Sequence, residues 1–293
     1  SRRFIFRGEL MEQNGRIAIL LTPTVLFLIG LFLIPLLVMG LFSFREGSFG
    51  EAQTAFTLRH YAEFFANEAY LRLLGRSVVL SFGVSVLTVL FAFPVAYYLS
   101  FFAGDKKYVL LTIIIVPAWV SYLLRVLSWK VILGGSGALA SFLSWLGLAQ
   151  EGGTLLLFSP EAVVVTLLYV WVPFVALPIF AGLERIDKDL LEAAYDLGCN
   201  RLQTFWRVTL PLSLPGVLAG FLFVFIPTVG EYVTPALVGG PEGIMFGNIV
   251  RDQFLRALNW PMGALMSLAM LVVVLVPLFI LSRFVRLSEL AGL

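Results

Sequence analysis

The sequence predicts an all-α membrane protein with six transmembrane helices. Of its 293 residues, 60% are hydrophobic and only 13% are charged, whereas a soluble domain carries about 25% charged residues. Six long stretches contain almost no Asp, Glu, Lys or Arg, and each could cross a hydrocarbon layer about 30 Å thick as a helix. So little charge cannot cover a water-soluble surface, and we therefore expect the chain in a lipid bilayer.

The composition excludes several classes of function. One cysteine, Cys199, rules out an intramolecular disulfide framework, and one histidine, His60, leaves no His/Cys cluster for zinc. No G-x-x-x-x-G-K-[ST] phosphate loop occurs, so we expect neither catalytic residues nor a bound cofactor in this chain. A net charge of +2 is too small to indicate nucleic acid as a partner.

The six predicted spans are the uncharged runs taken in order along the chain. They are expected at residues 17–44, 77–104, 108–132, 162–183, 211–235 and 262–284. The third is the least regular, because Arg125 interrupts it near its far end. Residues 138–148 also lack charge but form an apolar run of only 11 residues. That run is too short for a crossing, so we expect either an interfacial or a re-entrant helix there.

The distribution of Lys and Arg predicts the orientation of these spans. With the N-terminus inside, the inner segments hold 12 basic residues and the outer segments hold 6, or 8 if Arg125 and Lys130 are counted. Cytoplasmic segments of membrane proteins carry the excess of basic residues. Residues 1–16 are therefore expected as a cytoplasmic segment, residues 17–285 as the transmembrane domain and residues 286–293 as a cytoplasmic tail.

The inner loop at residues 185–210 is predicted to form two short helices. Asp187 is a plausible N-cap, an apolar stripe follows it, and Gly198 is well placed to end the first helix. A second helix is expected at about residues 201–208, because two prolines four positions apart follow it and should form a rigid elbow. This composition is equally compatible with a docking surface for another protein and with an amphipathic loop on lipid headgroups.

The spacing of residues in this loop resembles the "EAA" loop of ABC importer permeases. In that family the loop forms a coupling helix that binds a groove of a cytoplasmic ATPase. The resemblance implies ATPase-coupling roles for Glu192, Ala193, Ala194, Asp196, Gly198, Phe205, Pro211, Pro215 and Gly216.

Further motifs look like those of the putrescine/spermidine permease branch of this family. They are Val116–Ser121 with Arg125 and Trp129, Pro173-Phe174 with Leu177-Pro178, Gly230–Pro235 with Gly239-Gly240, and Asn259-Trp260-Pro261. The resemblance covers roughly residues 17–285. It implies the type I ABC importer permease fold, with a cytoplasmic coupling helix, in the bacterial inner membrane. The implied function is to form the translocation path for polyamines by alternating access.

The same resemblance implies the partners of the chain within the bilayer. They are a second homologous permease subunit that forms a heterodimer, two ATPase subunits that bind ATP and Mg, and an extracytoplasmic solute-binding protein. A permease for another small solute, such as an opine, an iron chelate or an aminophosphonate, remains an alternative. A secondary carrier is less favoured, because most of the spans lack the ionisable residues that a proton relay needs.

Glu231 is the best candidate for a substrate contact. Counted from Gly216 at a rise of about 1.5 Å per residue, it lies roughly 22 Å across the membrane, in the outer third. Ammonium groups of polyamines bind carboxylates and aromatic faces. The aromatic candidates for the substrate path are Tyr232, Trp119, Tyr122, Tyr169 and Trp171. Two alternatives stay open: Glu231 pairs with Arg125 or Lys130, or the aromatic residues are interfacial anchors.

Overall fold

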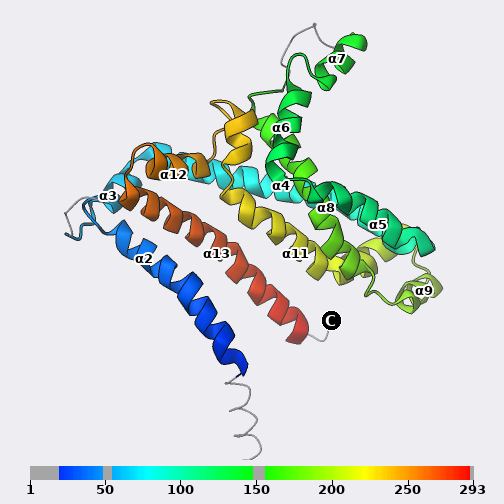
Figure 1. Ribbon diagram of the computed structural model, residues 1–293. Helices are drawn as coiled ribbons and strands as arrows, with labels where there is room; N and C mark the ends of the chain where they lie inside the picture. Colours follow the sequence, from blue (N-terminus) through cyan, green and yellow to red (C-terminus); the bar gives the residue numbers. More distant parts are fainter. Residues whose placement is uncertain (1–19, 49–54, 148–155, 291–293) are drawn as a thin grey trace, which may run out of the picture. The chain divides into compact units, whose positions relative to one another are not determined.

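The computed structural model describes residues 20–48, 55–147 and 156–290, with side chains up to residue 280. Six helices in this part of the chain are long and apolar enough to cross a membrane. They are Leu20–Ser43, Glu68–Phe101, Tyr122–Trp145, Pro160–Leu183, Arg201–Val229 and Trp260–Ile280. The protein is thus an all-helical, multi-pass membrane protein, as predicted (Figure 1). The predicted segment at residues 1–16, the first residues of span 17–44, residue 148 and the last three residues of the tail lie outside the described residues.

The helices of the described chain follow one another as consecutive elements. They are α2 (Ile34–Ser43), α3 (Arg59–Ala66), α4 (Glu68–Phe101), α5 (Lys107–Ile115), α6 (Tyr122–Leu133), α7 (Ala138–Trp145), α8 (Pro160–Leu183), α9 (Lys188–Asp196), α10 (Arg201–Thr204), α11 (Leu210–Val229), α12 (Phe246–Leu255) and α13 (Trp260–Leu290). Three π-helical turns, η1 (Ile29–Leu33), η4 (Phe205–Thr209) and η5 (Pro235–Gly239), and two 3₁₀ turns, η2 (Gly104–Lys106) and η3 (Val116–Trp119), lie between them.

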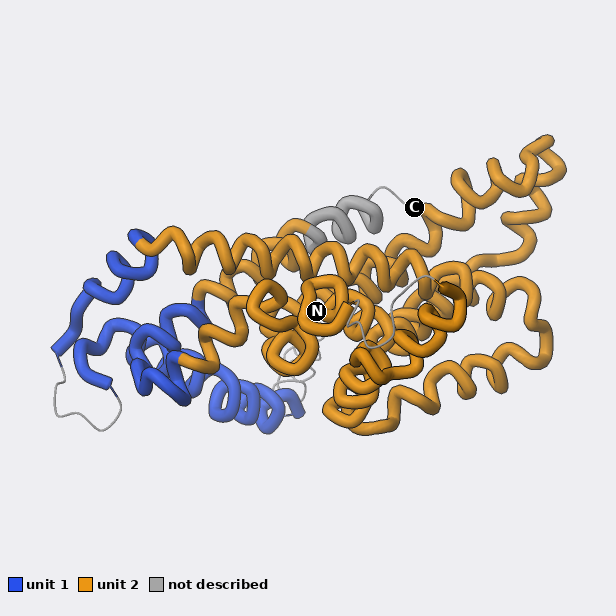
Figure 2. The backbone as a smooth tube through the Cα atoms, turned by 90° about the horizontal axis from the view of Figure 1, so that it is seen from above, with its two compact units in different colours: residues 1–66, 253–268 blue, residues 67–252, 269–293 orange. Residues whose placement is uncertain are grey.

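The chain divides into two compact units (Figure 2). Unit 1 combines residues 1–66 with residues 253–268, and unit 2 combines residues 67–252 with residues 269–293. In unit 1, the hydroxyl groups of Ser43 and Tyr61 lie 2.8 Å apart, and the rings of Phe44 and Tyr61 stack. These contacts join the end of α2 to α3.

The core of unit 2 is formed by α4, α8 and α11, which pack on one another (Figure 1). Buried hydroxyl side chains on α4 bond to carbonyl groups of the preceding turn, for example Ser81 to Ser77 and Ser85 to Ser81, each at 2.7 Å. These small side chains leave no polar group unsatisfied in an apolar layer and allow helices to approach closely. The closest approach is between Gly182 of α8 and Gly216 of α11, where a Cβ atom on Gly216 would lie 3.3 Å from the Cα of Gly182.

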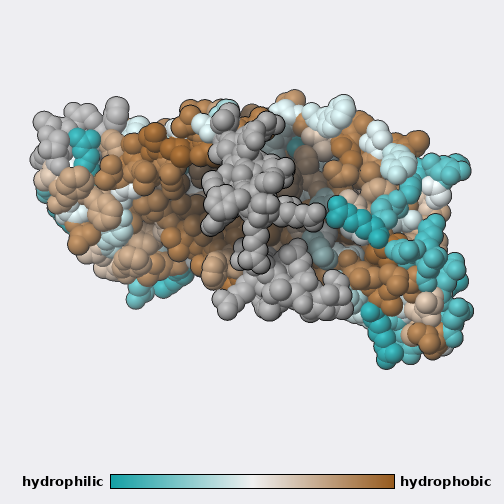
Figure 3. Space-filling model, turned by 90° about the horizontal axis from the view of Figure 1, so that it is seen from below, coloured by the Kyte–Doolittle hydropathy of each residue, from teal (hydrophilic) through white to brown (hydrophobic). Residues whose placement is uncertain are grey.

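The surface of the spans is apolar, as a lipid environment requires. Many large hydrophobic side chains are exposed along α2, α4, α11 and α13, for example Phe32, Leu90 and Phe279. In Figure 3 hydrophobic side chains cover the flank, and hydrophilic ones gather at the end of unit 2 that carries α9. This pattern places the polar ends of the helices outside the apolar layer.

The third predicted span, residues 108–132, is not one continuous helix. It consists of α5, a 3₁₀ turn at Val116–Trp119 and α6, and Val120 has an extended backbone with φ −66° and ψ 141°. Pro117 explains the break, because it lacks an N–H group and disfavours a helical conformation at the preceding residue. The membrane-length segment instead runs from Tyr122 to Trp145, through α6 and α7.

The apolar run at residues 138–148 forms α7 over Ala138–Trp145. It follows α6 directly, after a turn that begins at Gly134, where Gly134 N–H donates to Val131 O at 3.2 Å. An interfacial and a re-entrant position were both predicted for this helix, and each remains a prediction.

Candidate functional site

The predicted inner loop begins with α9, whose two ends have the predicted caps. The carboxylate of Asp187 accepts a hydrogen bond from Asp189 N–H at 3.1 Å, as an N-cap does. At the other end, Gly198 has a φ of +85°, and its N–H donates to Tyr195 O at 2.9 Å. Cys199 N–H donates to Ala194 O at 3.0 Å. This pair of bonds is a Schellman motif, which needs a left-handed residue at the position of Gly198.

The second helix of the loop does not end at a proline elbow, contrary to the prediction. α10 begins with a capping box between Asn200 and Gln203, and η4 then leads directly into α11. The result is one helical segment from Arg201 to Val229. Pro211 is tolerated because it lies at the first turn of α11, after a π-helical turn in which the regular bonding pattern is already changed.

The residues predicted for ATPase coupling divide into an inward and an outward set. Ala194 is buried, and Phe205 makes edge-to-face contacts with Phe93 and Tyr97 of α4, at centroid distances of 5.7 and 5.9 Å. These inward residues attach the loop to the helical core. The exposed residues of the predicted set are Glu192, Ala193, Asp196, Gly198, Pro211 and Pro215, and Gly216 is half-buried.

Large apolar side chains are exposed around α9 and α10. Leu197 is 86% exposed, Leu202 is 67% exposed and Trp206 is 60% exposed. We call Leu190, Tyr195, Leu197, Leu202 and Trp206 the exposed apolar surface of the loop. Their exposure lies at the hydrophilic end of unit 2, and contiguous apolar patches in such places are typical of protein–protein interaction sites.

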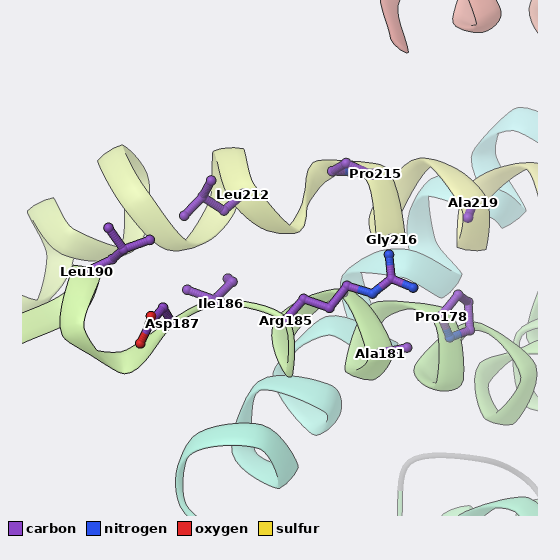
Figure 4. Close-up of a pocket in the computed structure, with 11 residues that line it drawn as sticks. Pro178, Ala181, Arg185, Ile186, Asp187, Leu190, Leu212, Pro215, Gly216 and Ala219 are labelled. Atoms are coloured by element: carbon purple, nitrogen blue, oxygen red, sulfur yellow. The ribbon is translucent and has the colours of Figure 1, made fainter. Parts of the chain in front are cut away.

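A cavity of about 460 Å³ lies behind this loop, between the end of α8 and the start of α11 (Figure 4). Pro215 and Gly216, two predicted coupling residues, line it. The side chain of Arg185 extends along the cavity toward Gly216, whereas the carboxylate of Asp187 lies at the other end and points away (Figure 4). The loop is also attached to α5, because Lys107 forms an ion pair with Glu184. The hydrogen bond from Lys107 to Glu184 raises the pKa of Lys107.

Glu231, the predicted substrate contact, lies in a turn directly after α11 rather than inside the helix. Its Oε1 atom accepts hydrogen bonds from the N–H groups of Val233 and Thr234, at 2.7 and 3.1 Å. Its Oε2 atom accepts a hydrogen bond from the Tyr122 hydroxyl at 2.7 Å. The Tyr122 hydroxyl also lies 2.6 Å from Thr234 Oγ1. The structure thus brings two predicted substrate-path residues together across 109 positions of sequence.

The alternative pairing of Glu231 with Arg125 or Lys130 is not what the structure shows. Within residues 20–48, 55–147 and 156–280, no ion pair joins Glu231 to a basic side chain. Arg125 is 7% exposed, and its Nη1 atom donates to the carbonyl of Val170 at 3.2 Å. Its guanidinium group also lies over the Phe174 ring, 5.8 Å from the centroid. Tyr122, a neutral donor, is the side-chain partner of Glu231 instead.

The other aromatic candidates have different neighbours. Trp171 packs on Phe174 and Phe223, Tyr169 on Trp129, and Tyr232 lies under the guanidinium group of Arg251. Trp119 is 84% exposed. Their common role in one substrate path therefore stays a prediction, as does the alternative that they are interfacial anchors.

The family of the chain follows from a comparison of its sequence with known families. A family model described as "Binding-protein-dependent transport system inner membrane component" matches residues 8–290. The chain belongs to this family. It is therefore a transport permease with several membrane-spanning helices, and the predicted family is confirmed.

Curated relatives cover nearly the whole chain. The spermidine/putrescine transport system permease protein PotB of Salmonella typhimurium (strain LT2) is 33% identical over 275 residues, which are 94% of each chain. PotB of Escherichia coli (strain K12) is 33% identical over 256 residues, covering 87% of this chain and 92% of the relative. The inner membrane ABC transporter permease protein YdcU of the same organism is 32% identical over 282 residues, which are 92% of this chain and 89% of the relative.

Solved structures confirm the predicted permease fold. A chain of a bacterial ABC transporter involved in the import of the acidic polysaccharide alginate matches with a TM-score of 0.70 and 18% identity, over 98% of this permease and 99% of that chain. The same kind of transporter in complex with an alginate pentasaccharide-bound periplasmic protein matches with a TM-score of 0.68 and 18% identity, over 92% and 93% of the two chains. At this identity the likeness shows the fold alone.

The permease also contains site residues that the sequence did not single out. Thr234 lies in the Gly230–Pro235 motif but was not selected as a candidate. Asn248 is buried, its side-chain amide donates to Tyr232 O at 2.8 Å, and its Oδ1 atom accepts from Met245 N–H at 3.0 Å. A Cβ atom on Gly247 would lie 2.7 Å from the carbonyl oxygen of Glu231. Asn248 and Gly247 lack any local pattern, so only the folded chain identifies them as supports of the Glu231 turn.

Proposed function

We propose that this permease is a membrane subunit of an ATP-driven importer of polyamines such as putrescine and spermidine. The observation that carries the substrate class is the 33% identity to PotB proteins over nearly the full length of both chains. The chemistry of the Glu231 turn fits this class, because a carboxylate without a charged partner among the described residues attracts ammonium groups. No observation favours an opine, an iron chelate or an aminophosphonate, and the family membership does not favour a secondary carrier.

The inner loop is the proposed contact with a separate ATPase subunit, where ATP and Mg would bind. Its exposed apolar surface and the outward residues Glu192, Ala193 and Asp196 support this role. Closure of an ATPase dimer would move the loop, and Phe205 would transmit the movement to α4 through its ring contacts. This arrangement requires the loop and both termini to be cytoplasmic, as the distribution of Lys and Arg predicts.

A second permease subunit, two ATPase subunits and an extracytoplasmic solute-binding protein complete the proposed importer in the bacterial inner membrane. A permease with one half of a path needs a homologous partner, and we propose a heterodimer. The periplasmic protein bound to the alginate transporter supports the last of these partners by analogy of fold.

Uptake by the reconstituted complex tests the proposed substrate class. The permease is produced together with the proteins encoded beside its gene, purified and placed in liposomes that contain ATP. We expect accumulation of radiolabelled putrescine or spermidine that depends on ATP and on the solute-binding protein. ATP-dependent accumulation of an opine or an iron chelate, without accumulation of either polyamine, would contradict the proposal.

A further inference from the structure

The hydroxyl group of Tyr122 lies within hydrogen-bond distance of two acceptors at the same time. It is 2.7 Å from Glu231 Oε2 and 2.6 Å from Thr234 Oγ1. A tyrosine hydroxyl carries one proton and therefore donates to one of these atoms at a time. The group has two arrangements: Thr234 donates to Tyr122 while Tyr122 donates to Glu231, or Tyr122 donates to Thr234.

The other carboxylate oxygen of Glu231 is already committed to the backbone. Oε1 accepts from Val233 N–H and Thr234 N–H, and Asn248 holds the same turn through the carbonyl of Tyr232. Glu231 itself is half-buried, so the carboxylate is accessible from one side. A cation that approaches it therefore has to compete for Oε2, the atom to which Tyr122 donates.

We propose that Tyr122 and Thr234 form a hydroxyl switch that releases Glu231 Oε2 to an alkylammonium group. This rests on the proposed function, because the arriving cation is taken to be one end of a polyamine. When the ammonium group donates to Oε2, the Tyr122 proton turns from Glu231 to Thr234, and the tyrosine keeps a hydrogen-bond partner. When the cation leaves, Tyr122 donates to Glu231 again. Thr234 acts through Tyr122 and is therefore a positioning residue.

Thr234 is the residue that makes this exchange inexpensive in free energy. Its side chain is fully buried, and it is the second acceptor within reach of the tyrosine proton. Without Thr234 Oγ1, an ammonium group on Oε2 would leave the half-buried Tyr122 hydroxyl without an acceptor, which is a destabilising state. The identity of residue 234 should therefore affect cation binding only while the tyrosine hydroxyl is present.

Equilibrium binding of radiolabelled spermidine to the purified transporter complex, without the solute-binding protein, tests the switch. This measurement avoids the affinity of the binding protein, which would dominate an uptake KM. The variants are Thr234→Val, Thr234→Ser, Tyr122→Phe and the double variant Tyr122→Phe/Thr234→Val. Thr228→Val is the matched control, because Thr228 is a neighbouring buried threonine whose hydroxyl has no hydrogen-bond partner among the described residues.

We expect Thr234→Val to weaken spermidine binding by at least about fivefold, whereas Thr234→Ser and Thr228→Val bind as the unmodified protein does. Tyr122→Phe and the double variant should bind equally well, because no hydroxyl then competes for Oε2. Unchanged binding by Thr234→Val, or the same loss in the Tyr122→Phe background, would overturn the switch. Spermidine binding by the unmodified complex keeps these outcomes separate from failure of the proposed function, in which that complex binds no polyamine.

Discussion

At the scale of single residues, Glu231 is held by three hydrogen bonds from neutral donors, two from the backbone and one from Tyr122. Neutral donors orient the carboxylate but do not cancel its charge, so it can attract a cation. Thr234 and Asn248 contribute to the same arrangement without any charge of their own. The geometry of the turn thus depends on hydrogen bonds, and the proposed affinity for cations depends on the charge of one residue.

Replacement of Glu231 by glutamine separates these two properties. Glu231→Gln keeps an oxygen that can accept from the backbone N–H groups of the turn, but it removes the negative charge. We expect ATP-dependent spermidine uptake to fall by about tenfold or more, because hydrogen bonds to charged groups are worth about 1.5–3 kcal/mol. Glu68→Gln, at an exposed position that begins α4, is the matched control and should transport normally. Normal uptake by Glu231→Gln would show that the substrate does not meet this carboxylate.

Gly198 is the second residue whose chemistry is decided by its backbone. A Cβ atom there would meet no heavy atom within 4 Å, so the cost of Gly198→Ala arises from its φ of +85° alone. That cost is about 1–2 kcal/mol for a residue with a side chain. We expect a normally expressed permease with impaired coupling of ATP hydrolysis to uptake, measured as the ratio of both rates. Gly83→Ala, inside α4 with equal space, is the control. Equal ratios in the two variants would argue against a role of this turn in coupling.

At the scale of elements, the crossing of α8 and α11 holds the inner loop on the helical core. A Cβ atom on Gly216 would lie 2.6 Å from the carbonyl oxygen of Pro178, which is too close for any side chain. The glycine therefore sets how closely the two helices approach. The cavity that Arg185 enters lies beside this crossing, at the base of the loop (Figure 4).

Enlargement of Gly216 should separate the two helices. Gly216→Ala forces the backbones apart, and overpacking of this kind typically costs about 1–3 kcal/mol. We expect a lower temperature of thermal unfolding in detergent, followed by the fluorescence of the tryptophans, with Gly83→Ala unchanged or slightly more stable. A Gly216→Ala protein as stable as the unmodified one would mean that α8 and α11 can adjust their distance freely.

At the scale of the whole molecule, the permease presents apolar side chains to two kinds of surroundings. Those along the spans match lipid, but Leu197, Leu202 and Trp206 lie at the hydrophilic end of unit 2 (Figure 3). Apolar groups in that position are stabilised by contact with another protein. The proposed importer supplies such a protein in the form of an ATPase subunit.

A charge in this surface should prevent assembly. Leu197 is 86% exposed, so Leu197→Glu changes the surface without disturbing internal packing. We expect the variant to be produced normally but to lose co-elution with the ATPase subunit in gel filtration. Leu255→Glu, an exposed position in α12 that is 70% exposed, is the matched control and should co-elute. Retention of the ATPase by Leu197→Glu would place the contact elsewhere.

The sequence by itself determined the class of the protein and most of its spans. The reason is physical: backbone groups in lipid must be satisfied within a helix, so long uncharged runs have one stable conformation there. The ends of α9 were equally legible, because caps such as Asp187 and Gly198 depend on local backbone geometry. Local rules of this kind need no knowledge of the rest of the chain.

The tertiary structure decided what distant residues do to one another. Pro117 ended a helix where composition indicated a continuous span, whereas Pro211 did not, because a π-helical turn precedes it. The partner of Glu231 could not be read locally, since Tyr122 lies 109 positions away and competes with nearer, oppositely charged candidates. Which donor reaches a carboxylate depends on how helices pack, and packing is a property of the folded chain alone.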